Sequence, residues 1–172
     1  LPMYYIVLPA EISTNLARFD GIRYGLSNKG DTLLQDYEKT RTEGFGEESK
    51  RRILIGTYVL SSGYIDAYYR KAEAGRDMVR AEYNEAFKTV DVIAVPTAPS
   101  VPFKLGEKSD PIALYLEDIF TVTANLTGNP AISVPMEGVE RDGKKLPLGI
   151  QFTAPHGAEN LLFAVGKMVT GE

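Results

Sequence analysis

Two charged residues, Arg52 and Asp118, could bind a charged ligand. Arg52 lies in the first turns of an otherwise amphipathic helical stretch. Asp118 lies in a run with Tyr115 and Leu116 on one side and Ile119 and Phe120 on the other. A guanidinium group can hold a carboxylate with two parallel hydrogen bonds, and a carboxylate can hold an ammonium group. Together these side chains could grip the two charged ends of a free amino acid. An ordinary salt bridge or a helix cap is the commoner explanation of such residues.

Other catalytic and metal-binding patterns are poorly supported. The single histidine, His156, stands between Pro155 and Gly157, where a solvated loop residue is more common than a catalytic base. Ser61-Ser62-Gly63 lacks the flanking glycines of a nucleophile loop and is expected to close a helix. The chain has no cysteine, so disulfides and cysteine-based metal sites are excluded. We therefore expect no catalytic residue and no metal site in this chain.

Composition indicates one domain or a large piece of one. The chain has 172 residues, of which 44% are hydrophobic and 24% charged, and its net charge is −4. Without a basic face, it is not expected to bind a nucleic-acid backbone by itself. The apolar stretch 1–10 is too short to span a membrane. Since the first residue is Leu1, we expect a processed chain, a fragment or a truncated protein.

The elements that must position Arg52 and Asp118 are predicted in the order helix, helix, strand, helix, strand, strand, helix. Apolar spacing predicts helices over residues 47–60 and 64–87, with weaker helical character over 32–42. A further helix is expected to start at Asp110-Pro111, with aspartate as N-cap, and the last to span 158–169. Residues 1–9 are interpreted as an extended inner strand or buried linker.

Strands are expected at 91–96, 131–136 and 148–153. The first is short, β-branched and interpreted as buried, and a polar hairpin turn at 141–145 connects the other two. Because Pro147 has no N–H for a ladder, the last strand is expected to start at Leu148. This order favours an α/β fold with a mixed sheet covered by helices.

The stretch DIFTVTANLTGNPAISVP at 118–135 resembles the C-terminal motif of the amidase signature family. Within that family the chain is most similar to the glutaminase (A) subunits of tRNA-dependent amidotransferases. Further blocks occur in the same order and cover nearly the whole chain: YYI at 4–6, NLARFDGIRYG at 15–25, RTEGFGEE at 41–48, KRRILIGTY at 50–58, YIDAYY at 64–69, PTAP at 96–99, YLEDIF at 115–120 and LPLGIQ at 146–151.

The resemblance implies a glutamine-hydrolysing enzyme. In such subunits a serine nucleophile, a second serine and a lysine release ammonia from glutamine through an acyl-enzyme. The ammonia converts Glu-tRNA(Gln) to Gln-tRNA(Gln) on the B subunit, which uses ATP and Mg²⁺, and the C subunit completes the complex. Glu-tRNA(Gln) would be held mainly by the B subunit, with no membrane involved. The setting would be the cytoplasm or an organellar matrix.

By motif position, the resemblance assigns substrate-binding roles to three residues. Arg52 would pair with the α-carboxylate of glutamine, and Asp118 would bind its α-ammonium group. Of the two adjacent tyrosines, Tyr4 is preferred to Tyr5 as the residue that would line the pocket. The family's Gly/Ser-rich nucleophile loop and its upstream lysine are absent from this sequence. Residues 1–172 are thus expected to be the C-terminal part of a single amidase-signature domain, inactive alone and without a cofactor of its own.

The sequence also departs from the family pattern. Asn129 stands where leucine is usual before Pro130, Thr123 stands where proline is frequent, and Met136 where cysteine is frequent. None of these removes an expected substrate contact. Two alternatives remain: part of another amidase-signature amidohydrolase, or a non-catalytic binding or scaffold module. Paired charges at Arg52 and Asp118 favour an amino-acid substrate over an apolar amide, because burying unpaired charge is costly.

Overall fold

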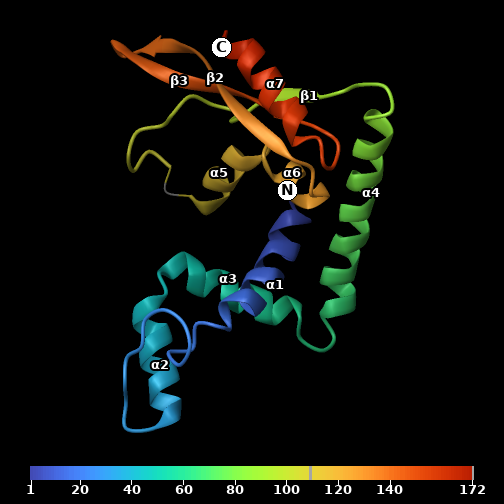
Figure 1. Ribbon diagram of the computed structural model, residues 1–172. Coiled ribbons are helices and arrows are strands. Elements are labelled where there is room, and N and C mark those ends of the chain that lie inside the picture. The colour runs from blue at the N-terminus through green and yellow to red at the C-terminus, as the bar shows by residue number, and fades with distance from the viewer. Residues whose placement is uncertain (109, 172) are drawn as a thin grey trace. The chain divides into compact units, whose positions relative to one another are not determined.

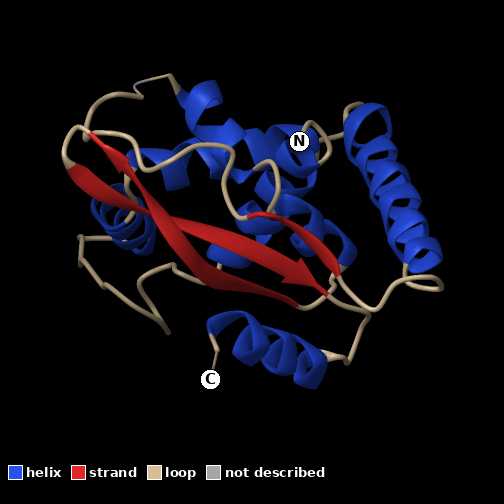
Figure 2. Ribbon diagram, turned by 90° about the horizontal axis from the view of Figure 1, so that it is seen from above, coloured by secondary structure: helices blue, strands red, loops and turns tan. Residues whose placement is uncertain are grey.

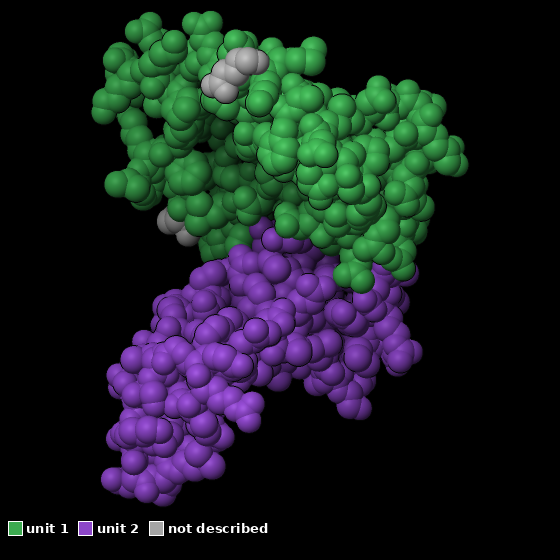
Figure 3. Space-filling view, viewed as in Figure 1, with its two compact units in different colours: residues 1, 76–172 green, residues 2–75 purple. Residues whose placement is uncertain are grey.

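The chain forms two units, which are described one at a time. The computed structural model describes residues 1–108 and 110–171. Residues 2–75 make one unit, called here the helical unit, and residues 76–172 with Leu1 make the other, called the sheet unit (Figure 3). Helix α4 (Arg70–Ala86) begins in the first and ends in the second.

The helical unit is built around the contact of two helices. Its elements are α1 (Tyr4–Leu16), α2 (Leu33–Gly44), α3 (Glu47–Val59) and a π-helical turn, η1 (Ile65–Tyr69) (Figure 1). Helix α1 packs against α3. Gly56 of α3 lies so close to α1 that a Cβ atom there would overlap the carbonyl oxygen of Pro9. The absence of a side chain at position 56 therefore permits this helix contact.

The prediction of an extended segment at 1–9 is wrong, because helix α1 begins at Tyr4. Val7 donates its backbone N–H to the carbonyl of Met3 at 2.9 Å, which closes the first turn. Val7 and Ala10 are three residues apart on one face and both are buried. The continuous apolar run and Pro9 favour a strand or linker locally. Packing of the face with Val7 and Ala10 against α3 nevertheless stabilises a helix.

The other helices of this half agree with the sequence. The expected helices at 32–42 and 47–60 correspond to α2 and α3, and Thr32 caps α2 by accepting the N–H of Gln35 at 3.3 Å. The expected helix at 64–87 corresponds to η1 followed by α4. The π-helical turn at its start was not predicted.

The sheet unit contains a three-stranded sheet in the order β1-β3-β2 (Figure 2). Its strands are β1 (Ile93–Pro96), β2 (Ala131–Arg141) and β3 (Lys144–Thr153), and both pairings are antiparallel. The expected hairpin turn joins β2 to β3, and Asp142 and Gly143 take φ values of 52° and 70° there. Two successive positive φ values are typical of a tight hairpin whose twist matches its strands.

Strands β2 and β3 are longer than predicted. Strand β3 begins at Lys144 rather than at Leu148, so the argument from Pro147 is wrong. The ladder pairs Leu146 with Val139 and Leu148 with Met136, and its register shifts between those points. Pro147 therefore stands at an irregularity, where a missing N–H costs the ladder little. Strand β1, expected to be buried, alternates between half-buried and exposed residues at the edge of the sheet.

Short helices connect the strands, and one longer helix covers a face of the sheet. The short ones are α5 (Pro111–Tyr115), the 3₁₀ turn η2 (Leu116–Asp118) and α6 (Val122–Thr127). As expected, Asp110 caps α5 by accepting the N–H of Ala113 at 3.1 Å. Helix α7 (Glu159–Thr170), expected at 158–169, lies along the sheet (Figure 2). Its Leu162 belongs to one core cluster with Val134 and Phe152.

The expected α/β fold class is confirmed by this arrangement. Helices precede, separate and follow the strands along the chain, and the core of the sheet unit lies between the sheet and α7. Among the described residues, strand pairing is antiparallel throughout. The parallel pairs of a mixed sheet are therefore not found in this part.

Filling the gap between α1 and α3 should destabilise the helical unit. We expect Gly56→Ala to lower the free energy of unfolding by about 1–3 kcal/mol, because the added methyl group meets backbone atoms that cannot rotate away. Urea-induced unfolding measures this. The matched variant Gly46→Ala, where nothing lies within 4 Å, should cost less than about 1 kcal/mol through the N-cap of α3. Equal effects would contradict the packing role of Gly56.

Candidate functional site

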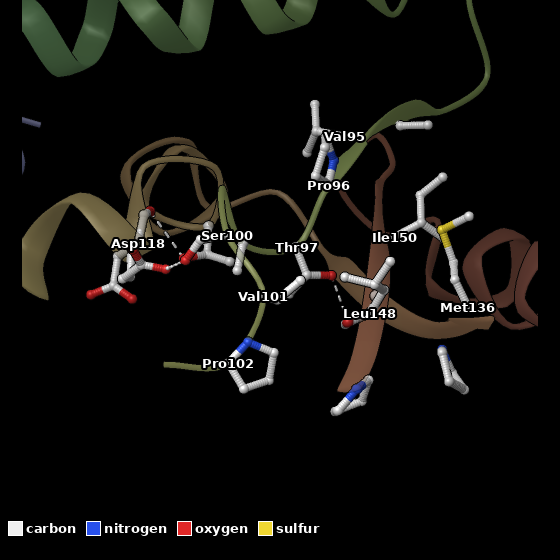
Figure 4. A pocket seen from close by; sticks show the side chains of 18 of the residues that line it. Val95, Pro96, Thr97, Ser100, Val101, Pro102, Asp118, Met136, Leu148 and Ile150 are labelled. Carbon is white, nitrogen blue, oxygen red and sulfur yellow. Dashed lines mark hydrogen bonds between the residues drawn. The ribbon is translucent and has the colours of Figure 1, made fainter. Parts of the chain in front are cut away.

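The sheet unit contains a cavity of about 940 Å³ in front of its sheet (Figure 4). It is bounded by β1 and the loop after it, by η2 and the residue Thr121, and by β2 and β3. The lining is mostly apolar and comprises residues 94–98, 100–103, 117, 118, 121, 133, 135, 136 and 147–150. An apolar cavity with a few polar groups is typical of a small-molecule site.

Two neighbouring acids on the cavity wall have different surroundings. Glu117 accepts a hydrogen bond from Ser100 Oγ at 2.8 Å and forms an ion pair with Lys108. The Lys108 hydrogen bond, followed by that of Ser100, holds the pKa of Glu117 below its usual value of 4.5. Glu117 is therefore an engaged carboxylate with little remaining capacity for a cationic ligand.

Asp118 also lines the cavity, but its carboxylate is exposed. Within residues 1–108 and 110–171, the carboxylate of Asp118 has no hydrogen bond or ion pair. Its backbone is well held, since the Asp118 carbonyl accepts both the N–H and the hydroxyl of Thr121, at 3.0 and 3.1 Å. The wall thus presents one neutralised acid, Glu117, and one available acid, Asp118, which Figure 4 shows on the cavity wall.

The sequence reasoning missed a pair of hydroxyl groups on the sheet side of the cavity. Thr97 Oγ1 and Ser133 Oγ are 2.7 Å apart and hydrogen-bonded, and both residues line the cavity (Figure 4). Gly149 lies beside them, where a Cβ atom would come within 2.8 Å of one oxygen and 2.9 Å of the other. Thr97 and Gly149 belong to two of the family-like blocks, at 96–99 and 146–151. Those blocks were the signal that could have found the pair.

Arg52 and Tyr4, the other expected ligand-binding residues, lie in the helical unit. Arg52 Nε donates to Glu48 Oε1 at 2.8 Å, and the Arg52 side chain is 22% exposed. The Arg52 guanidinium carbon lies 6.0 Å from the centre of the Tyr5 ring. The Tyr4 ring packs edge-to-face against the same Tyr5 ring, with centroids 5.1 Å apart.

The structure thus groups Arg52 and Tyr4 around Tyr5 in one unit, and it puts Asp118 on a cavity of the other. That all three hold one ligand remains a prediction. The Arg52 side chain is partly exposed, and in the predicted role a ligand carboxylate would meet it beside the Glu48 ion pair.

A second feature that the sequence did not reveal is a row of tyrosines at the end of α3 and in η1. The rings of Tyr58 and Tyr64 have centroids 4.3 Å apart, and those of Tyr64 and Tyr68 are stacked at 6.1 Å. The hydrogen bond with Tyr64 raises the pKa of Tyr58 to about 12. π-Helical turns are frequent at functional sites, but these rings lie outside the cavity lining.

Ser61 and His156 lie at a helix end and in a loop, respectively. Ser61 donates its hydroxyl to the carbonyl of Tyr58 at 2.7 Å, as a residue closing a helix does. His156 is exposed in the loop before α7. In the part of the chain that the structure describes, no group of three or more His, Asp or Glu side chains is placed to hold a metal ion. In that same part, no helix has the length and apolar character needed to cross a membrane.

The ion pair on the cavity wall should respond to pH in a defined direction. A carboxyl group with a lowered pKa stabilises the fold above its usual pKa, and this contribution disappears as pH falls through the lowered value. We expect Lys108→Met to raise the pKa of Glu117, as measured by carboxyl ¹³C NMR titration. The matched variant Lys104→Met, whose lysine pairs with Asp142, should leave the pKa of Glu117 unchanged. An unmoved pKa in Lys108→Met would refute the assigned cause.

Comparison with known proteins gives a consistent picture. The family model described as Amidase matches residues 1–163. The A subunit of glutamyl-tRNA(Gln) amidotransferase from Pelagibacter ubique is 59% identical over 152 residues, covering 88% of this chain and 31% of that protein. The A subunit from Maricaulis maris is 55% identical over 170 residues, covering 98% of this chain and 34% of that protein. The chain spans about a third of the length of these curated relatives.

Solved structures support the same assignment. The crystal structure of the A subunit of glutamyl-tRNA(Gln) amidotransferase from Thermotoga maritima is 38% identical, with a TM-score of 0.56 over 78% of this chain and 30% of that one. A bacterial aryl acylamidase of the amidase signature family shares the fold, with a TM-score of 0.58 at 20% identity over 92% of this chain and 32% of that one. The fold, the family model and the relatives agree, and the chain belongs to the Amidase family.

Proposed function

We propose that this chain is the C-terminal, glutamine-binding part of the glutaminase subunit of a tRNA-dependent amidotransferase. The observation that carries the proposal is the available Asp118 carboxylate on the wall of a cavity, beside a Glu117 that Lys108 already neutralises. Such a wall offers one negative charge to one ammonium group. The similar proteins are named as A subunits of glutamyl-tRNA(Gln) amidotransferase, which supports an amidotransferase as the complete enzyme.

In this proposal the charged ends of glutamine are held by residues of this chain. Asp118 accepts the α-ammonium group, and Arg52 pairs with the α-carboxylate, for which a guanidinium group is well shaped. Tyr4 lines the site next to Tyr5. Fixing both ends of the substrate aligns its side-chain amide for attack by a nucleophile.

The chemistry of amide cleavage would come from the rest of the protein. The expected serine nucleophile, second serine and lysine are not in this chain, so residues 1–172 alone would be inactive. Ammonia would pass to the B subunit of the amidotransferase, which would hold Glu-tRNA(Gln) and use ATP and Mg²⁺ to form Gln-tRNA(Gln), and the C subunit would complete the complex. The complex would act in the cytoplasm or an organellar matrix.

One alternative is part of another amidase-signature amidohydrolase, as the shared fold of the aryl acylamidase illustrates. Another is a non-catalytic binding module. The complete reading frame and the intact mass of its product separate these possibilities. A longer product with a Gly/Ser-rich nucleophile loop and an upstream lysine supports the proposal, whereas a natural product starting at Leu1 leaves a module without catalysis.

Loss of Arg52 should impair glutamine use selectively. In the complete glutaminase with its partners, we expect Arg52→Ala to raise the KM for glutamine by roughly 30-fold or more, as removing one partner of a charge pair costs about 2 kcal/mol or more. Amidation supported by added ammonia should be unchanged. Arg51→Ala is the matched control, because Arg51 pairs with the same Glu48 but is more exposed. An equal loss of ammonia-dependent activity would make Arg52 structural instead.

Asp118→Asn keeps the size of the side chain but removes its charge. We expect a rise of similar size, roughly 30-fold, in the KM for glutamine, with ammonia-dependent amidation preserved. Asp91→Asn, which neutralises an exposed acid outside the cavity, should leave both activities unaltered. A normal KM for glutamine in Asp118→Asn would remove Asp118 from the substrate site.

A further inference from the structure

Gln151 is a buried polar residue at the centre of the sheet. It is 5% exposed and lies on β3, opposite Val95 of β1 and Ser133 of β2. Its strand neighbour Phe152 belongs to the core beneath α7. Because successive side chains of a strand point to opposite faces, Gln151 projects to the face away from α7.

On that face Gln151 meets the turn that carries Asp118. Its Nε2 donates a hydrogen bond to the carbonyl oxygen of Phe120 at 3.1 Å. Phe120 stands two residues after Asp118, and the Thr123 hydroxyl reaches the same carbonyl at 3.2 Å. Among the residues described, this is the only side-chain hydrogen bond between β3 and residues 118–121.

Packing alone does not explain a glutamine at this position. A buried amide costs free energy unless it is hydrogen-bonded, and an apolar residue would serve a core position better. The far end of the same segment is also anchored, because Arg80 Nε donates to the carbonyl of Thr127 at 3.2 Å. The segment from Asp118 to Thr127 is therefore held by a side chain near each end.

We infer that Gln151 is a positioning residue for Asp118. By fixing the Phe120 carbonyl to the central strand, it sets where the Asp118 carboxylate enters the cavity and hence where a substrate ammonium group can bind. The inference rests on the proposed function, since it deepens the account of the same site. A displacement of about an ångström at a binding group is enough to weaken substrate positioning severely.

The test uses the complete glutaminase assembled with its partners. We expect Gln151→Met to raise the KM for glutamine about tenfold, with kcat changed less than about twofold and ammonia-dependent amidation unchanged. In an Asp118→Asn background the same substitution should change the KM by less than about twofold, because both act through one contact. Additive effects, or an unaltered KM in the single variant, overturn the inference.

Thr153→Val is the matched control. Thr153 lies two residues along β3 on the same face and is 1% exposed, and its side chain has no hydrogen bond with residues 118–121. This variant should leave the KM for glutamine unchanged. If Gln151→Met fails to fold, Gln151→Asn provides a second variant, since its amide is one methylene too short to reach Phe120. It should show the same rise in KM, and a normal KM there also refutes the role.

A readout independent of activity separates this inference from the proposed function. Amide hydrogen exchange at Thr121, whose N–H donates to the Asp118 carbonyl, should accelerate at least about tenfold in Gln151→Met and stay unchanged in Thr153→Val. Faster exchange with a normal KM for glutamine refutes the positioning role alone. A wild-type complex without glutamine-dependent amidation refutes the proposed function, whatever the exchange rates.

Discussion

The pairing of β3 with a strand on each side is the constraint on which the sheet unit depends. One face of β3 supplies Phe152 to the core beneath α7, and the other supplies Gln151 to the turn before α6. Because side chains alternate along a strand, a slip of one residue would exchange these faces. It would place an amide in the core and a phenyl ring against the cavity side. The register therefore fixes stability and the candidate site together.

Ion pairing, and not only the number of acids, decides how much negative charge the cavity wall offers to a ligand. Two consecutive carboxylates line the wall, yet Lys108 and Ser100 engage Glu117 and leave Asp118 available. A ligand with a single ammonium group then meets a single charge. In the helical unit Arg52 is likewise kept beside Glu48, which limits the cost of its partial burial. Neighbouring residues thus engage the Arg52 side chain and the acid next to Asp118, and the linear sequence only partly reveals these pairings.

Local sequence signals predicted the elements whose ends or periodicity are strongly marked. Asp110-Pro111 and the turn at Asp142-Gly143 were predicted correctly, because caps and turns act over a few residues. The cap of α2 by Thr32 was not predicted. The N-terminal helix was missed because its stability comes from contact with α3, which no local pattern contains. The full length of β3 was missed for a similar reason, since the irregularity that accommodates Pro147 depends on its partner strand. For the site, residue type and motif blocks singled out Asp118 and Arg52, whose binding roles remain predictions. The contact between Thr97 and Ser133 and that between Gln151 and Phe120 became visible only in three dimensions, although all four residues lie in family-like blocks.

The two outer strands of the sheet also affect how these residues can be handled in isolation. Among the described residues β1 and β2 each have a partner on one side only, so their other sides present backbone groups to any extended peptide. Pro96 and Pro135 have no backbone N–H and so interrupt the rows of hydrogen-bond donors on these two strands. This restricts the alignments that an added strand can adopt. A preparation of this chain alone would accordingly tend to self-associate through a few defined strand registers, and a charged residue introduced along either outer strand would keep it dispersed.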